Sequence, residues 1–97
     1  METELEIHLQ EGFHGETIVI SVDGETVGRV RAESSFATGL AHIEPIHADK
    51  GQMLDLAIEG TGTHATLPVA PEAPFVTLNL RDGALICGAT ERRPGYV

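Results

Sequence analysis

Histidine and acidic side chains are the groups in this 97-residue sequence that could bind a metal ion. None of the five histidines forms the i, i+4 pair of a zinc protease or lies in a cysteine-containing zinc motif. The alternation of apolar and polar residues places His8, His42 and His64 away from the core. Two of them on neighbouring strands could bind zinc together with a carboxylate. Surface histidines with no shared role are the alternative.

Calcium is the second metal to consider, because hard cations prefer several carboxylate and carbonyl oxygens on turns. The stretches 16–25 and 44–49 supply acidic residues near predicted turns, although neither reproduces an EF-hand loop. The candidate ligands for calcium or zinc are His8, His42, His64, Asp23 and Asp49.

No catalytic motif accompanies these residues. The sequence contains no Gly-rich phosphate loop, no Gly-x-Ser-x-Gly elbow and no dinucleotide-binding fingerprint. Cys87 could act as a nucleophile, but its predicted hairpin register places it on the core face, where a thiol behaves as a small hydrophobe. We therefore expect no enzymatic activity and no cofactor.

The net charge of −9 is unevenly distributed along the chain. Residues 1–49 contain ten acidic residues and two arginines (net −8), whereas residues 50–97 contain five acidic and four basic residues (net −1). Nucleic acids and anionic membranes are bound through Lys and Arg, so neither partner is expected. The acidic half could form an interaction face or serve only to keep the surface solvated. The candidate face comprises Glu11, Glu16, Asp23, Glu25, Glu44 and Asp49.

Short alternating runs of apolar and polar residues, separated by Gly, Pro and Asp, predict an all-β fold. We expect a single domain over residues 1–90, a small antiparallel β-sandwich of about seven or eight strands. The proline-rich segment 68–74 is expected to cross between the two sheets. Residues 91–97 have no periodicity, as is typical of a mobile tail.

The last predicted hairpin has the clearest register. An Asp-Gly turn at residues 82–83 favours a two-residue type I′ connection, because both central positions need a positive φ. This turn predicts apolar pairs on one face, namely Leu80 with Leu85, Leu78 with Cys87 and Val76 with Ala89.

Two further hairpins follow the same logic. The Asp-Gly turn at residues 23–24 pairs Ile20 with Val27 on the core face, and Gly28 is a plausible bulge. A type II′ turn at residues 60–61 predicts the pairs Leu56 with Ala65 and Leu54 with Leu67.

The segment before Pro45 permits either a helix or a strand, and Gly39 favours an irregular strand over residues 38–43. Among the few aromatic residues, Phe13 is expected to be exposed in a loop, while Phe36 could lie in the core. Sugar-binding platforms need exposed aromatic faces, so Phe13 is the residue on which such a site would depend.

Seven or eight strands of this length resemble immunoglobulin-like or transthyretin-like sandwiches, although the Cys…Trp…Cys signature of immunoglobulin domains is absent. Such sandwiches support many functions, so the resemblance implies the fold alone.

The sequence thus predicts a non-enzymatic module for protein interaction or assembly, with a protein partner or a second copy of the chain as its ligand. The alternative is a ligand-binding module for a divalent metal or a small polar ligand such as a carbohydrate. A single cysteine cannot form an intramolecular disulfide, and the N-terminus lacks the pattern of a signal peptide. A cytoplasmic location is therefore expected.

Overall fold

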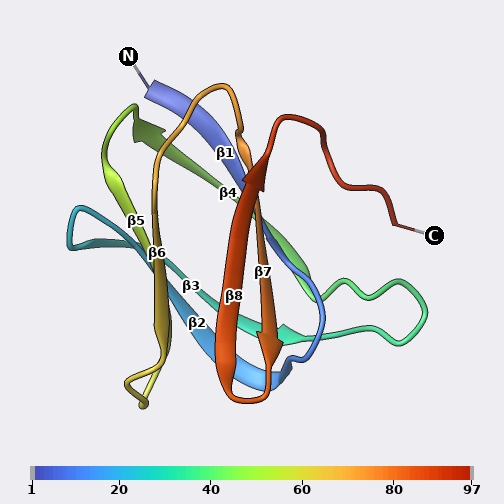
Figure 1. The fold of residues 1–97 in the computed structure, drawn as a ribbon. Coiled ribbons are helices and arrows are strands. Elements are labelled where there is room, and N and C mark those ends of the chain that lie inside the picture. Colours follow the sequence, from blue (N-terminus) through green and yellow to red (C-terminus); the bar gives the residue numbers. More distant parts are fainter. Residues whose placement is uncertain (1, 97) are drawn as a thin grey trace.

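The computed structural model describes residues 2–96 and folds them into eight β-strands in two facing sheets (Figure 1). This architecture confirms the predicted small β-sandwich and its number of strands. Nowhere in residues 2–96 does a helix reach the length and hydropathy of a membrane span. The strands are β1 (Glu2–Leu9), β2 (His14–Val22), β3 (Glu25–Glu33), β4 (His42–Asp49), β5 (Met53–Ile58), β6 (His64–Pro68), β7 (Phe75–Arg81) and β8 (Ala84–Thr90).

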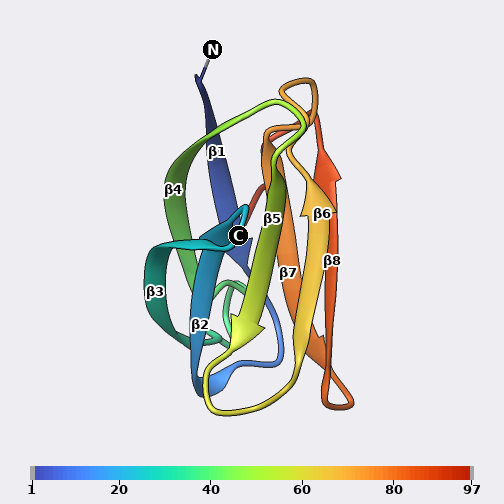
Figure 2. The same ribbon diagram turned by 90° about the vertical axis from the view of Figure 1, so that its left-hand side faces the viewer.

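The strand order is β4-β1-β7-β8 in the first sheet and β3-β2-β5-β6 in the second. The prediction that the proline-rich segment connects the sheets is confirmed, since residues 69–74 carry the chain from β6 to β7 (Figure 2). β7 then runs parallel to β1, whereas the other five strand pairs described within residues 2–96 are antiparallel, as predicted. The immunoglobulin constant-type sandwich keeps its first, second, fourth and fifth strands together, whereas here these strands are divided between the sheets.

The core lies between the inner faces of the two sheets. Successive side chains of a strand point to opposite faces, so the apolar residues of each alternating run gather on one side. Eight large aliphatic side chains of β1, β2, β5 and β7 are each at most 1% exposed: Leu5, Ile7, Leu9, Ile18, Ile20, Leu54, Leu56 and Leu78. The predicted alternation of β1 and β2 is therefore confirmed.

The β7–β8 hairpin has the predicted register. Leu80 is paired with Leu85, and Leu78 with Cys87, while Asp82 and Gly83 have φ values of 52° and 78°. Two successive positive φ angles are the requirement of a type I′ turn. Cys87 is half-buried and packs against the core, as the register predicts.

The β2–β3 hairpin differs by one residue from the prediction. Its turn has positive φ values at residues 23–24, as expected, but Ile20 is paired with Gly28 rather than with Val27. The register shifts between Ile20 and Ser21, so Val27 is the extra residue and is 45% exposed. The bulge thus precedes Gly28, because a bulge turns the extra side chain out of the pleat.

The β5–β6 hairpin has the predicted pairs of Leu54 with Leu67 and Leu56 with Ala65. Its turn is not the predicted two-residue turn at 60–61. The amide and hydroxyl of Thr61 both donate to the carbonyl of Ile58, at 3.3 and 3.0 Å, which closes a tight turn one residue earlier inside a longer loop. A side chain that bonds to nearby backbone competes with the standard turn.

The two loop aromatics are reversed relative to the prediction. Phe13 is fully buried, whereas Phe36 is fully exposed in the loop 34–41, and β4 begins only at residue 42. Ser34 accounts for the first change, because its hydroxyl accepts the amide of Phe13 at 3.0 Å and donates to the carbonyl of Gln10. These bonds hold the β1–β2 connection against the sandwich and turn Phe13 inward.

The packing of Gly12 in this connection gives a testable prediction. Gly12 has a φ of 93°, and a side chain there would overlap the carbonyl oxygen of Leu80 in β7. Gly12→Ala should therefore lower the free energy of unfolding by about 2–5 kcal/mol, from backbone strain plus overpacking. Gly24→Ala, at a φ of 84° with open space around it, should cost only about 1–2 kcal/mol. Urea denaturation measures both, and equal losses would contradict this account.

Candidate functional site

The predicted histidine ligands lie in three separate places. His8 is on the outer face of the first sheet, where it is fully buried. His42 lies 2.8 Å from a carboxylate oxygen of Glu44, and His64 lies 2.8 Å from Asp55 on the outer face of the second sheet. Each histidine therefore has its own carboxylate partner, Glu6 in the case of His8.

The orientation predicted for His42 is wrong. His42 is paired with Leu9, and residues directly opposite on neighbouring strands share a face of the sheet. The same phase places Ile46 in the core, so His42 belongs to the inner side. Ile43, the apolar neighbour that suggests the opposite phase, is paired with His8 on the outer face instead.

The two predicted aspartate ligands lie at the end of the sandwich that carries the β2–β3 turn. The Asp23 carboxylate accepts the amide of Met53 at 2.8 Å and the side-chain amide of Gln52 at 3.2 Å. The backbone amide of Asp49 donates to Gln52 at 2.7 Å. Neither aspartate lies with the three histidines, and within residues 2–96 no group of three His, Cys, Asp or Glu side chains could hold a metal ion.

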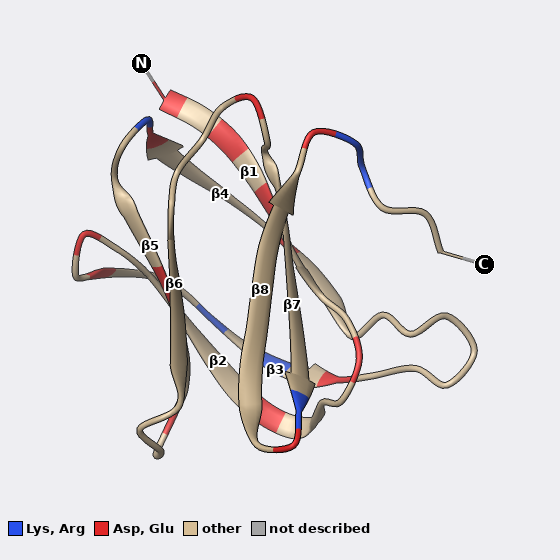
Figure 3. Ribbon diagram, viewed as in Figure 1, with Lys and Arg blue, Asp and Glu red and all other residues tan. Residues whose placement is uncertain are grey.

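The six acidic residues of the candidate interaction face are divided between the two ends of the sandwich. Glu11, Glu16 and Glu44 lie towards the end where β1 meets β2. The other three residues lie at the opposite end, around the β2–β3 turn and the end of β4. Figure 3 shows acidic residues at both ends rather than on one surface. The six therefore do not form one continuous face.

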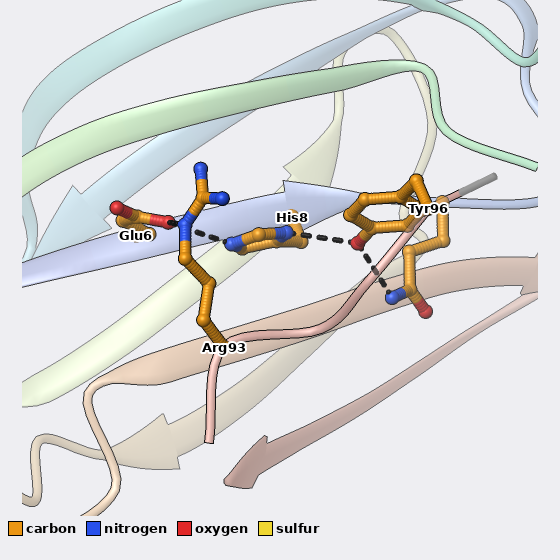
Figure 4. Close-up of polar contacts among 5 residues, drawn as sticks. Glu6, His8, Arg93 and Tyr96 are labelled. Carbon is orange, nitrogen blue, oxygen red and sulfur yellow. Dashed lines mark hydrogen bonds and ion pairs between the residues drawn. The ribbon is translucent and has the colours of Figure 1, made fainter. Parts of the chain in front are cut away.

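A polar network around the buried His8 is the feature that the sequence did not predict (Figure 4). Glu6 and His8 alternate on the outer face of β1, and the C-terminal segment 91–96 folds back over them. One carboxylate oxygen of Glu6 accepts Nε of Arg93 at 2.9 Å and lies 2.9 Å from Nε2 of His8. The other ring nitrogen of His8 lies 2.8 Å from the hydroxyl of Tyr96.

The network continues along the sheet beyond Tyr96. The Tyr96 hydroxyl accepts a hydrogen bond from the side-chain amide of Gln10 at 2.9 Å. The side-chain oxygen of Gln10 in turn accepts one from the side-chain amide of Asn79 at 2.9 Å. A neutral His8 with its proton on Nε2 satisfies every partner, since it donates to Glu6 and accepts from Tyr96. Within residues 2–96, no buried side-chain nitrogen or oxygen lacks a partner.

Aromatic contacts close the space around His8. The ring of Tyr96 stacks on His8 with a centroid distance of 5.8 Å and an angle of 20°. Phe75 of β7 meets His8 edge-on at 6.3 Å and 82°. An imidazole on the outer face of a sheet is normally solvated. His8 is completely buried because Tyr96 of the C-terminal segment and Phe75 of β7 cover it. The C-terminal segment has no strand periodicity, and its single tyrosine is the only feature of its sequence that indicates packing against the sheet.

The charge of Glu6 depends on this arrangement. The hydrogen bond from His8 lowers the pKa of the Glu6 carboxyl, and the hydrogen bond and charge of Arg93 lower it further, while partial burial opposes both. The carboxylate form is therefore favoured. Glu6 links the strand to the returning segment as an ion, and its protonation would weaken the contacts with both partners.

Two hollows lie at the end of the sandwich formed by the loops 10–13 and 34–41. The larger has a volume of about 480 Å³, within the range of small-molecule sites, and the exposed ring of Phe36 lies at its wall. The smaller, about 370 Å³, reaches Tyr96. The polar residues that line the larger hollow are Glu11, His14, Ser34, Ser35 and Thr38.

The free edges of the two sheets differ in how they are protected. Exposed edges are normally blocked by charges, prolines, bulges or short length. β3 has a bulge and several charged residues, β4 contains Pro45, and β6 has five residues and ends at Pro68. β8 has seven residues with no charge and no proline, and its Ile86 is 48% exposed.

No protein-family model matches the chain, and no curated protein or solved structure does so either. The class of protein is therefore defined by the fold: an eight-stranded β-sandwich with a polar network around a buried histidine on one outer face and an edge strand without charge or proline.

The Glu6 link predicts that docking of the C-terminal segment depends on pH. The pKa of Glu6 is lowered in the folded state. The stabilisation of the docked segment by Glu6 is therefore fully present above the unfolded pKa of about 4.3, and it is lost as the pH falls through the folded-state pKa. Tyr96 is the only tyrosine and there is no tryptophan, so tyrosine emission reports this contact. We expect the emission to change in an acidic transition with its midpoint below about pH 4.3.

Glu6→Gln should abolish this transition, because the amide cannot ionise. Glu4→Gln is the matched control. Glu4 lies on the same face of β1, but it is mostly exposed, and its ion-pair partner is His47 at 3.7 Å rather than a residue of the C-terminal segment. Far-UV circular dichroism at each pH checks that the sandwich stays folded. A transition that persists in Glu6→Gln and disappears in Glu4→Gln would contradict the assignment.

Proposed function

We propose that this domain is a non-enzymatic interaction module that binds an extended protein segment along the free edge of β8. The observation that supports the proposal is that β8 contains no charge, proline or bulge, while the other three edge strands each have such a device or are short. An unblocked edge is the surface on which strand addition operates, with main-chain hydrogen bonds providing affinity.

The hydrogen-bonding groups of this edge follow from the β7–β8 turn. In a two-residue hairpin the residues that flank the turn exchange both backbone hydrogen bonds, and such pairs alternate along the ladder with non-bonded pairs. Arg81 and Ala84 flank the turn, so every second residue of β8 from Ala84 bonds to β7. The amides and carbonyls of Leu85, Cys87 and Ala89 therefore point to the free edge.

These groups have no strand partner among residues 2–96. β6 packs beside β8 (Figure 2), but the two strands belong to different sheets and are not hydrogen-bonded neighbours. The outer side of the edge offers Ile86, which is half-exposed, and the inner side offers the half-buried Leu85 and Cys87. An incoming strand would find apolar contacts on both of its faces.

The remaining features agree with a binding role rather than a catalytic one. His8 is fully buried, so its polar network does not offer it to a substrate. We also propose the cytoplasm as the location, because the single cysteine has no disulfide partner within the chain.

A carbohydrate-binding module is the second candidate, and the larger hollow favours it. The fully exposed ring of Phe36 beside a carboxylate and several hydroxyl groups is the combination that sugars use, an apolar face with polar rims. Phe36 takes the part that the sequence suggested for Phe13.

The sugar alternative has its own test. If the hollow binds a sugar, a glycan array should give reproducible hits, and Phe36→Ala should weaken the best one by about tenfold or more, close to 1.4 kcal/mol. Val27→Ala, another exposed apolar position, is the control and should change nothing. An array without hits would end this alternative.

The strand-addition proposal predicts binding of extended apolar peptides. A fluorescent peptide that alternates Val and Thr should raise its anisotropy with the protein, and Ile86→Lys should weaken binding by at least about tenfold, through lost apolar contact. Met53→Lys is the matched control, because Met53 is 45% exposed on the outer face of the second sheet. Both variants should keep their stability within about 0.5 kcal/mol.

A second peptide with proline at its centre tests the binding mode. It stays extended but lacks a central amide donor, so strand pairing predicts that it binds poorly. Equal affinity for both peptides, or equal loss in Ile86→Lys and Met53→Lys, would refute strand addition at β8.

A further inference from the structure

We propose that the segment accepted by β8 is β8 of a second copy, paired antiparallel about a two-fold axis at Cys87. This inference rests on the proposed function, since it assigns the partner of the same edge. It would join the two first sheets into one continuous sheet across the dimer. A two-fold contact uses the same surface on both copies, so β8 must be complementary to itself.

The outward hydrogen-bonding groups select the position of the axis. Leu85, Cys87 and Ala89 point outward, and in an antiparallel pair outward residues must face outward residues. With the axis at Cys87, Leu85 faces Ala89 of the second copy, Cys87 faces itself, and about six hydrogen bonds form. Moving the axis to Ile86 or Gly88 leaves one outward residue facing a turn or the tail and reduces the number to about four.

The side chains fit the same register. On the outer side, Ile86 lies opposite Gly88 of the second copy, and the space above Gly88 is open, with only the Thr77 hydroxyl near a side chain placed there. The half-exposed Ile86 would thus cover a glycine on the partner. On the inner side, Leu85 lies opposite Ala89, a large residue against a small one. Such pairs avoid both a clash and a void.

The charges around β8 permit the approach of a second copy. The chain carries −9 overall, but residues 50–97 carry only −1 and β8 itself carries none. The two-fold brings the turn residue Asp82 towards the end of the partner's strand, which Glu91 and Arg92 follow in the sequence. The opposite charges of Glu91 and Arg92 offset each other there, so no net repulsion opposes the pairing.

Sedimentation velocity over a range of protein concentrations tests whether the chain dimerises. We expect a reversible monomer–dimer equilibrium in the wild type. Ile86→Lys should raise the dissociation constant at least tenfold, since it places a lysine against the partner's strand. Met53→Lys, equally exposed on the other sheet, should leave the equilibrium unchanged.

Cysteine cross-linking tests the register. Facing residues in a bonded antiparallel pair have Cα atoms about 5.5 Å apart, within the range that a disulfide spans. Copper–phenanthroline, which accepts the two electrons released as two thiols lose their protons, should therefore trap wild-type dimers through Cys87. The reaction needs an alkaline buffer, because burial raises the pKa of the Cys87 thiol.

A pair of variants excludes chance collisions. In a Cys87→Ser background, Leu85→Cys and Ala89→Cys should each fail to cross-link alone, yet cross-link when mixed, because only the mixture brings the two new cysteines opposite each other. Circular dichroism and a denaturation curve of each variant check that the sandwich is intact. Cross-linking of either variant alone, as efficient as the mixture, would overturn the register.

The outcomes separate this inference from the proposed function. A chain that stays monomeric but binds the extended peptide, with loss in Ile86→Lys, overturns the second copy as partner and leaves strand addition standing. A chain that neither dimerises nor binds the peptide overturns both. A dimer that is insensitive to Ile86→Lys and does not cross-link through Cys87 uses another surface, and this result also overturns the inference.

Discussion

β1 is the strand on which the rest of the structure depends, because both of its edges are paired with other strands and both of its faces carry buried side chains. Its inner side chains Leu5, Ile7 and Leu9 are at most 1% exposed and fill the centre of the core. Its edges pair with β4 and β7, which joins the beginning, the middle and the end of the chain. Its outer face holds His8 and Glu6, which anchor the C-terminal segment. A small domain with a limited core gains stability by using both faces of one strand.

The polar network and the unprotected edge divide the first sheet into two regions of different character. Near β1, every buried polar side-chain atom within residues 2–96 has a partner, which ties Tyr96 and Arg93 to the sheet. At β8, two strands away, the edge groups lack a strand partner and the side chains carry no charge. The C-terminal segment follows β8 directly and folds towards β1. The chain thus covers the outer face of the sheet around His8 and leaves the edge groups of β8 without a strand partner.

The parts of the fold that could be predicted from the sequence are those that local chemistry determines. The register of β7–β8 follows from an Asp-Gly turn and matched apolar pairs, both visible within residues 76–89. The burial of Phe13 depends on Ser34, which lies 21 residues away, and the burial of His8 depends on Tyr96, 88 residues away. Turn propensity and alternation carry no information about such distant partners. The phase of His42 could not be predicted for a related reason, since the apolar Ile43 lies opposite His8 on the outer face of the sheet.

The parallel pairing of β1 with β7 has a consequence for the order in which the chain can fold. Glu6 meets Phe75 across this pair, so the first sheet closes only when residues from the last quarter of the chain are present. The second sheet is built from neighbouring hairpins, β2–β3 and β5–β6, whose turns are local. Local contacts form quickly, whereas long-range pairing must first overcome the entropy of closing a large loop. One edge of β1 therefore stays unpaired until β7 has been synthesised, and we expect completion of the first sheet to be the slow step of folding.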